Sequence, residues 1–207
     1  MLYIKMPYKF SFSGHTTDFQ CPVACFRCMG TTKTGSRCSK RTCIGSPFCW
    51  IHLLSEKKLR IKDSTIPNAG KGVFVQDASK RPNAVVFKAG AEIVDYFGEM
   101  IGKTQLEERY GERGVAHDDT GPYAAVISEV EPGLYEDAAC QRGAGAIVNQ
   151  ARRFASNNVR FKVKRPQNGK KYITIAATKD IKNNKELFLW YGENYRMNEP
   201  GVSYRTK

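Results

Sequence analysis

Six of the seven cysteines of this chain lie close together, between Cys21 and Cys49. The surrounding segment is rich in Thr, Gly and basic residues and has little hydrophobic periodicity, so it cannot bury a core of its own and needs a cross-link. The N-terminus lacks the apolar stretch of a secretory signal, and we therefore expect reduced thiols. Under reducing conditions, such crowding favours metal ligation over disulfides.

The spacing of the ligand-type residues is typical of a structural zinc site. Cys49 and His52 are three residues apart and form one chelating pair, while Gly35 allows the chain to turn back before Cys38. Buried free thiols are the simpler alternative. Spacing alone leaves the ligand set open and provides enough donors for a second ion; the candidates are His15, Cys21, Cys25, Cys28, Cys38, Cys43, Cys49 and His52.

Length and charge distribution suggest a larger body with a smaller basic module. The 207 residues suit one domain of about 150 residues plus a smaller unit, and no run approaches the ~18 apolar residues of a membrane span. Residues 1–62 hold 11 Lys and Arg against 2 acids, which suggests a polyanionic partner. Residues 92–137 hold 12 acids against 3 bases and could face a cationic peptide, although both stretches also fit ordinary solvated surfaces.

Beyond residue 60 the chain predicts a β-rich body. Residues 53–62 read as a short turn or helix that leads into a first strand, and residues 103–112 are the best helix candidate. The Asn168-Gly169 pair predicts a tight hairpin between two strands. The expected strands are 72–76, 91–101, 123–130, 159–165, 171–177 and 186–191.

Four motifs in this body stand in a fixed order, although each alone could be a turn or part of the core. They are Gly70-Lys71-Gly72, Tyr96-Phe97-Gly98-Glu99, Gly145 to Asn149 with Asn158 downstream, and Glu186 to Tyr191. Together they resemble the SET domain of protein lysine methyltransferases over about residues 58–196. The resemblance implies a mainly β fold of short sheets with a C-terminal pseudoknot and few short helices, joined to a small N-terminal zinc-binding module.

The same resemblance implies a division into parts and a set of site residues. The parts are an extension (1–20), a zinc-binding module (21–56), the SET domain (57–196) and a tail (197–207). S-adenosylmethionine is the implied methyl donor, with Tyr191 and Tyr123 as catalytic residues. The implied cofactor-binding residues are Lys71, Gly72, Val73, Tyr123, Asn149, Gln150 and Tyr191.

The zinc segment carries a resemblance of its own, to a small Cys-Cys-Cys-His motif of proteins from large DNA viruses. That motif matches Cys28, Cys38, Cys49 and His52, for which it implies a structural zinc ion. A short body joined to such a motif is similar to SET proteins of large eukaryotic DNA viruses. Two positions depart from the family pattern, namely Gln150, where His is usual, and Leu189, where an aromatic residue is common.

We therefore expect a protein lysine N-methyltransferase that acts on a histone or another lysine-bearing protein tail. Methyl transfer needs a neutral lysine, and an apolar channel beside a sulfonium cation would lower the lysine's pKa from about 10.4. The basic N-terminal module could dock on nucleosomal DNA, no membrane is involved, and a homodimer is left open. The expected location is intracellular, in a host nucleus or a virion. The alternative is a non-catalytic zinc and SET-like protein that binds chromatin or nucleic acid in a virion.

Overall fold

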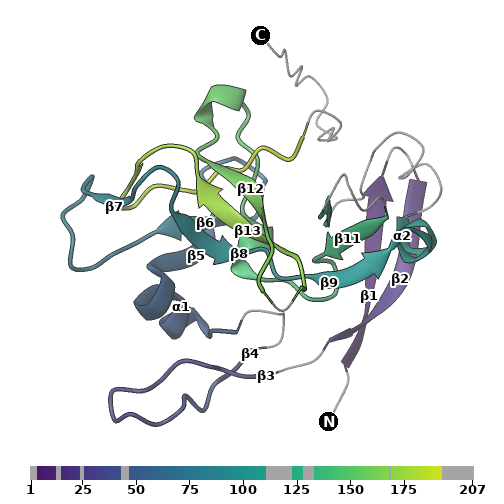
Figure 1. Ribbon diagram of the computed structural model, residues 1–207, viewed down its shortest axis with the longest axis horizontal. Coiled ribbons are helices and arrows are strands. Elements are labelled where there is room, and N and C mark those ends of the chain that lie inside the picture. The colour runs from purple at the N-terminus through teal and green to yellow at the C-terminus, as the bar shows by residue number, and fades with distance from the viewer. Residues whose placement is uncertain are drawn as a thin grey trace.

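In the part of the chain that the structure describes, many short strands are combined with two short α-helices (Figure 1). This computed structural model describes residues 4–12, 15–23, 26–42, 47–110, 123–127, 133–167 and 169–192, and before residue 26 only the backbone. The helices are α1 (Trp50–Lys57) and α2 (Lys103–Tyr110), and among the described residues neither is long or apolar enough to cross a membrane. The strands are β1 (Ile4–Phe12), β2 (His15–Val23), β3 (Phe26–Arg27), β4 (Arg41–Thr42), β5 (Leu59–Asp63), β6 (Lys71–Val75), β7 (Val85–Phe87), β8 (Glu92–Asp95), β9 (Glu99–Gly102), β10 (Ala124–Val126), β11 (Leu134–Asp137), β12 (Val159–Lys164), β13 (Tyr172–Ala177) and β14 (Ile181–Lys182).

A three-stranded antiparallel sheet of order β12-β13-β8 lies at the centre of the molecule (Figure 1). Strand β13 is buried along most of its length because it lies between two partners, and Ile173 and Ile175 have no exposed surface. The predicted hairpin is confirmed, since β12 and β13 pair from Val159 with Ala177 to Lys164 with Tyr172. This sheet contributes most of its apolar face to the main hydrophobic core.

A second sheet of order β10-β11-β9 follows, and the single strand expected over residues 91–101 is divided between the two sheets. The break falls at Phe97, whose φ of 60° lies in the left-handed region, and at Gly98. A Cβ at position 98 would lie 2.7 Å from the backbone carbonyl of Asp137, so only glycine allows this approach. Helix α2 covers Lys103–Tyr110 of the predicted helix, whose last two residues lie outside the described ranges, and it packs on this sheet.

The C-terminal segment from Glu186 to Tyr191 is not the regular strand predicted from its apolar run. It is extended and makes isolated bridges from Glu186 to Phe74, from Phe188 to Asn149 and from Leu189 to Val159. The segment therefore lies between β6 on one side and residues 149–159 on the other, as expected for the pseudoknot. The backbone N–H of Leu187 donates to the carbonyl of Val73 at 2.8 Å, which fixes this placement.

The cysteine-rich segment packs against the body through helix α1. Leu53 of α1 is 3% exposed and belongs to the main core, and Phe48 packs against the same core. The backbone N–H of Gln76 donates to the carbonyl of Lys58, which joins the end of the helix to β6. The predicted fold class, mainly β with few short helices and a small cysteine-rich module, is confirmed. The predicted boundaries of the parts stay predictions.

Candidate functional site

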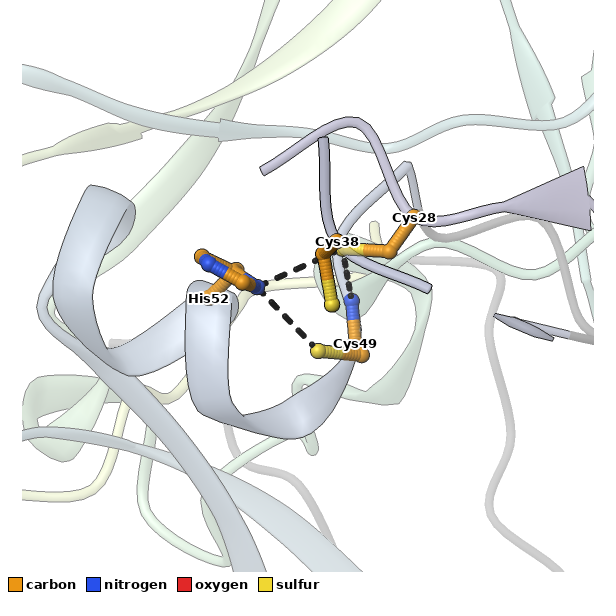
Figure 2. A group of neighbouring side chains, drawn as sticks. All are labelled: Cys28, Cys38, Cys49 and His52. Atoms are coloured by element: carbon orange, nitrogen blue, oxygen red, sulfur yellow. Dashed lines mark hydrogen bonds between the residues drawn. The ribbon is translucent and has the colours of Figure 1, made fainter. Parts of the chain in front are cut away.

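Three cysteines and one histidine meet beside helix α1. The ligand atoms of Cys28, Cys38, Cys49 and His52 lie within 4.8 Å of one another, and all four residues are buried. Figure 2 shows the four side chains converging, with Nδ1 of His52 3.5 Å from Sγ of Cys28 and 3.4 Å from Sγ of Cys49. The structure thus brings together the four residues singled out by the Cys-Cys-Cys-His motif.

The other potential ligands fall outside what the structure describes. This applies to Cys25 and Cys43 and to the side chains of His15 and Cys21. A second metal ion bound by these residues therefore stays a prediction from the sequence.

Local backbone structure explains how the four ligands converge. Cys49 is the N-cap of α1 and His52 lies in its first turn, so the two side chains share one face of the helix. Cys28 and Cys38 lie on the two arms of a loop between β3 and β4. The loop is closed by hydrogen bonds from Cys38 N–H to the Gly30 carbonyl and from Cys28 N–H to the Lys40 carbonyl, both 2.8 Å long.

The donor set fits a tetrahedral zinc ion. Metal–sulfur and metal–nitrogen bonds of about 2.3 and 2.0 Å separate the two ligand atoms by about 3.5 Å, which agrees with the sulfur–nitrogen distances found here. The second ring nitrogen of His52, Nε2, lies 2.9 Å from the carbonyl oxygen of Thr31. Because a carbonyl only accepts hydrogen bonds, Nε2 carries the proton and Nδ1 directs its lone pair toward the sulfurs.

Two backbone groups and one glycine complete this centre. The N–H groups of Gly30 and Cys49 donate to Sγ of Cys28 at 3.4 and 3.2 Å, an arrangement that stabilises a thiolate. A Cβ at position 30 would lie 2.2 Å from Cγ of His52, so any other residue would displace the imidazole. The spacing of metal ligands in the sequence does not identify Gly30, because this glycine binds no metal and only leaves room for the His52 imidazole.

A second cluster, which we call the Tyr191 cluster, contains all of the predicted catalytic and cofactor-binding residues. It consists of Lys71, Gly72, Val73, Tyr123, Asn149, Gln150 and Tyr191, with Val148 and Tyr96 as linking residues. Its parts come from strand β6, the turn before residue 151, the start of β10 and the C-terminal segment. The pseudoknot arrangement brings these distant segments into contact.

Asn149 connects the glycine-flanked turn to the rest of the cluster. Its side-chain Nδ2 donates to the backbone carbonyl oxygen of Lys71 at 2.9 Å, while its backbone carbonyl accepts from Leu189 N–H at 2.9 Å. Val73 has no exposed surface, and its backbone carbonyl accepts the N–H of Leu187, so this residue supports the turn and is not itself exposed to a ligand. Gly70 has a φ of +69°, and no atom lies within 4 Å of the place where its Cβ would be. The exposed backbone at Gly70 and Lys71 therefore fits the close approach of a small ligand.

Glu186 holds the loop that precedes this turn. Its buried carboxylate accepts hydrogen bonds from Ser64 Oγ at 2.6 Å, Thr65 N–H at 2.7 Å and Thr65 Oγ1 at 2.5 Å. A Cβ at Gly72 would lie 2.1 Å from Oε1 of Glu186, so the glycine is needed for this packing. The closing motif of the sequence includes Glu186, but its spacing gives no sign that the carboxylate reaches back to residues 64 and 65.

Tyr191 is held at both ends by the segment before residue 151. Its hydroxyl donates to the carbonyl oxygen of Val148 at 2.5 Å, and its backbone N–H donates to Oε1 of Gln150 at 2.9 Å. The ring is half-buried and packs against the main core. Both the hydroxyl and the backbone of Tyr191 therefore have a defined position.

Gln150 does in this chain what a histidine ring nitrogen could do, since it offers a hydrogen-bond acceptor to Tyr191. The residue is 1% exposed, and its Nε2 has no hydrogen-bond partner among the residues that the structure describes. An amide brings one acceptor and one donor group, whereas this site uses only the acceptor. Gln150 in place of the usual histidine thus keeps an acceptor for Tyr191 N–H but leaves its own buried Nε2 donor unsatisfied.

Tyr123 is connected to the cluster through a third tyrosine, Tyr96. The hydroxyl of Tyr96 donates to the carbonyl oxygen of Tyr123 at 2.8 Å, and the Arg142 guanidinium lies 3.8 Å from the centre of the Tyr123 ring. Burial raises the pKa of Tyr96 well above its usual value, and the nearby Tyr191 raises it further. Tyr96 therefore remains protonated and acts as a donor at neutral pH.

A buried polar network supports the β9–β11 sheet beside this cluster. Arg109 of α2 donates to Asp137 at 2.5 Å and to Glu99 at 2.6 Å, and the Tyr110 hydroxyl also donates to Asp137, at 2.9 Å. Burial raises the pKa of Tyr110, and the charge of Asp137 adds to this effect. Burial alone would lower the pKa of Arg109, but the hydrogen bonds to Glu99 and Asp137 outweigh it and raise the pKa. The sequence alone did not link these residues, because α2 and β11 are distant in the chain.

Glu136, the neighbour of Asp137, joins the two main sheets. Its carboxylate accepts the N–H of Gly98 at 3.0 Å and the N–H of Ile173 at 2.6 Å. Burial raises its pKa, against the opposing effect of these two backbone donors. The residue fixes the junction where the predicted single strand divides.

Comparison with known proteins agrees with this arrangement. A family model described as SET domain matches residues 71–192, more than half of the chain. Histone-lysine N-methyltransferase EZH2 from Chaetomium thermophilum is 26% identical over 140 residues, which are 67% of this chain and 8% of that protein. The chain therefore spans less than a tenth of the length of this relative.

Solved structures from the same fungus are similar in fold. A crystal structure of the Chaetomium thermophilum Polycomb repressive complex 2 superposes with a TM-score of 0.52 at 27% identity, over 72% of this chain and 17% of that chain. A structure described as ctPRC2 in complex with H3K27me3 and H3K27M gives a TM-score of 0.53 at 26% identity, over 72% and 16%.

Proposed function

The chain belongs to the SET domain family, and we propose that it is an S-adenosylmethionine-dependent protein lysine N-methyltransferase. The observation that carries this proposal is the Tyr191 cluster. Within the stretch that matches the SET model, contacts between distant segments join Tyr191 to the glycine-flanked turn. One relative of the chain, from a fungus, is named as a histone-lysine N-methyltransferase.

The residues of the cluster suit the proposed cofactor. When bound, S-adenosylmethionine supplies an electrophilic methyl group on a sulfonium. The open backbone at Gly70 and Lys71 would hold its methionine end, and Asn149 and the backbone of Gln150 would contact its polar groups. Tyr123 would lie beside it.

Tyr191 is proposed to orient the substrate amine. Its hydroxyl proton is directed to the Val148 carbonyl, so the lone pairs of Oη remain available to accept an N–H from the lysine. That contact would direct the lone pair of the amine toward the methyl group, and such alignment is a main source of acceleration when no covalent intermediate is needed. The half-buried rings of Tyr123 and Tyr191 suit the methylene stem of a lysine and a methylated cation.

A structural zinc ion in the Cys28, Cys38, Cys49 and His52 centre is the second part of the proposal. Zinc would hold the loop between β3 and β4 against helix α1, whose Leu53 is in the main core. The zinc module would then support the body and not only extend from it.

The substrate is proposed to be a histone tail. The related fungal protein is named as a histone-lysine methyltransferase, and one similar structure contains H3K27me3 and H3K27M. The acidic stretch of residues 92–137 suits a cationic tail, and the basic N-terminal residues suit nucleosomal DNA. With the similarity of the short body and zinc motif to viral SET proteins, these features support a location in a host nucleus or a virion.

Gln150 favours a second candidate, a non-catalytic SET-like protein that binds chromatin. Its unsatisfied Nε2 departs from what an optimised site would contain. One assay separates the two candidates, namely tritium transfer from labelled S-adenosylmethionine into core histones, followed by peptide mapping. We expect label on lysine; binding of histones or DNA with no incorporated label, on histones or on other lysine-bearing proteins, would support the non-catalytic alternative.

A further inference from the structure

A basic hollow lies on the surface of the SET domain, and its lining shares Thr65 and Glu186 with the surroundings of the Tyr191 cluster. It has a volume of about 630 Å³ and is bordered by the turn at Ala155 and Ser156 and by residues 179–188. Neither the metal ligands nor the seven residues of the Tyr191 cluster line it. The proposed methyl transfer thus leaves this feature without a role.

Four exposed lysines surround the hollow. Lys179, Lys182 and Lys185 line it, and Lys62 lies at its edge because its Nζ is 4.0 Å from the centre of the Phe74 ring, which forms part of the lining. Lys179 donates to a neutral acceptor, the carbonyl of Ala155, at 3.0 Å. Within the described ranges, none of the four lysines forms an ion pair with a carboxylate.

The two acids that line the hollow are already engaged elsewhere. Asp180 accepts from Lys88 Nζ at 2.9 Å and from Ala89 N–H at 3.0 Å. Glu186 is buried and bonds the Ser64–Thr65 loop. The positive charge of the hollow is therefore uncompensated. By contrast, Lys162 and Lys164 on β12 share the carboxylate of Glu92, at 2.8 and 2.5 Å.

We propose that this hollow binds the phosphate backbone of duplex DNA. Lysine ammoniums act as point charges on phosphates, whereas recognition of protein carboxylates favours the bidentate fork of arginine, and no arginine lines the hollow. The two lining rings are unavailable for stacking on unpaired bases, since Phe74 is 3% exposed and Phe188 is half-buried. Backbone contact with a duplex is thus favoured over a single strand.

The hydroxyl and amide groups in the lining suit the same ligand. Ser156 and Asn184 are exposed beside the lysines and can donate to phosphate oxygens, as such side chains commonly do. None of these groups is arranged to read base edges. The binding is therefore expected to be independent of sequence, and it would hold DNA on the SET domain itself in addition to any contact by the N-terminal residues.

The test is binding of the full chain to a short labelled DNA duplex by fluorescence anisotropy, across about 50–200 mM salt and without cofactor. Each phosphate contact contributes about 0.9 to the slope of log affinity against log salt, so Lys182→Gln/Lys185→Gln should reduce the slope by about 1.8. The control is Lys162→Gln/Lys164→Gln, which removes the same number of charges outside the hollow, at two lysines that pair with Glu92, and its slope should match the wild type. Lys185→Glu should weaken binding further than Lys185→Gln.

Because the assay does not measure methyl transfer, its outcome is separate from that of the proposed function. Equal slopes for the hollow variant and the wild type would overturn the proposal, and so would equal reductions in the hollow and control variants. If the hollow variant lost binding to duplex RNA or to polyglutamate while its DNA binding stayed unchanged, the hollow would bind a different partner. That result would also reject the proposal. Matching melting temperatures would show that each variant is folded.

Discussion

The zinc centre and the Tyr191 cluster achieve a fixed geometry in different ways. In the zinc centre, four ligand atoms from a short stretch of chain converge within 4.8 Å around a place for one ion. In the Tyr191 cluster, hydrogen bonds between segments separated by 41 to 78 positions hold the side chains. In our proposal the first depends on a metal, whereas the second depends on the pseudoknot being formed.

This difference predicts how each region fails. Loss of one zinc ligand removes the binding free energy of the ion at once, and the short loop has no core of its own to replace it. Loss of one hydrogen bond in the Tyr191 cluster leaves the others and the apolar core in place. Damage to the zinc centre should therefore be large and mainly structural, while damage to the cluster should be smaller and mainly functional.

The largest effect is expected from the zinc ligands. The purified protein should contain about one zinc per chain at the cluster, and Cys49→Ser should release it, because structural zinc is worth about 10 kcal/mol or more in small modules. Hydrogen exchange should then increase over residues 26–57, as measured by mass spectrometry with metal analysis of the same sample.

The matched control is Ser39→Ala, an exposed neighbour of Cys38, which should keep its zinc and its exchange protection. A wild-type protein that is fully folded without zinc would contradict the structural role of the ion.

A smaller effect is expected at Glu186, which contacts both the pseudoknot segment and the loop before the glycine-flanked turn. Glu186→Gln keeps the shape of the side chain but removes the charge that accepts hydrogen bonds from Ser64 and Thr65. Hydrogen bonds to charged groups contribute about 1.5–3 kcal/mol, so urea unfolding should show a loss of about 2–4 kcal/mol. Asp180→Asn, an exposed acid on the same side of the molecule, is the control and should change stability by less than about 1 kcal/mol.

Gln150 should show a still smaller effect, divided between stability and rate. Gln150→Leu removes the acceptor for Tyr191 N–H and should destabilise the fold by about 1–3 kcal/mol. If Gln150 positions Tyr191, the same variant should also lower kcat more than it raises KM, since the misplaced tyrosine acts on the transition state.

Gln150→His serves as the conservative variant, because an imidazole nitrogen can accept the same hydrogen bond. We expect it to recover most of the rate lost in Gln150→Leu. Two variants with equal kcat would mean that Gln150 has only a packing role.

The sequence predicts much of the zinc centre and less of the Tyr191 cluster. Cys49 and His52 could be paired from their spacing because both lie at the start of one helix. The roles of Gly30 and the Thr31 carbonyl could not be predicted. Gly30 leaves room for the His52 ring, and the Thr31 carbonyl is a backbone group that no side-chain pattern marks. The run of residues 91–101 reads as one strand because the turn at Phe97 is set by contact with Asp137, which no local pattern reports.

The C-terminal segment shows the same limit more clearly. Its apolar run predicts a strand, but its hydrogen-bonding groups are divided between β6 and residues 149–159. The roles of Glu186 and Val148 depend on that threading, and so they emerge only from the three-dimensional structure. The strand bounds of β6, β12 and β13, by contrast, lie within one residue of the prediction because their patterns are local.

Tyr191→Phe tests the central claim, that the Tyr191 cluster is the site of methyl transfer, most directly. The substitution keeps the ring and removes only the hydroxyl that donates to Val148. Initial rates of methyl transfer to a confirmed substrate should fall by at least about tenfold, equivalent to about 1.4 kcal/mol, while cofactor affinity changes little. Tyr172→Phe, a half-buried tyrosine on β13 outside the cluster, should retain the wild-type rate. A Tyr191→Phe protein with the wild-type rate would contradict the assignment of the active site.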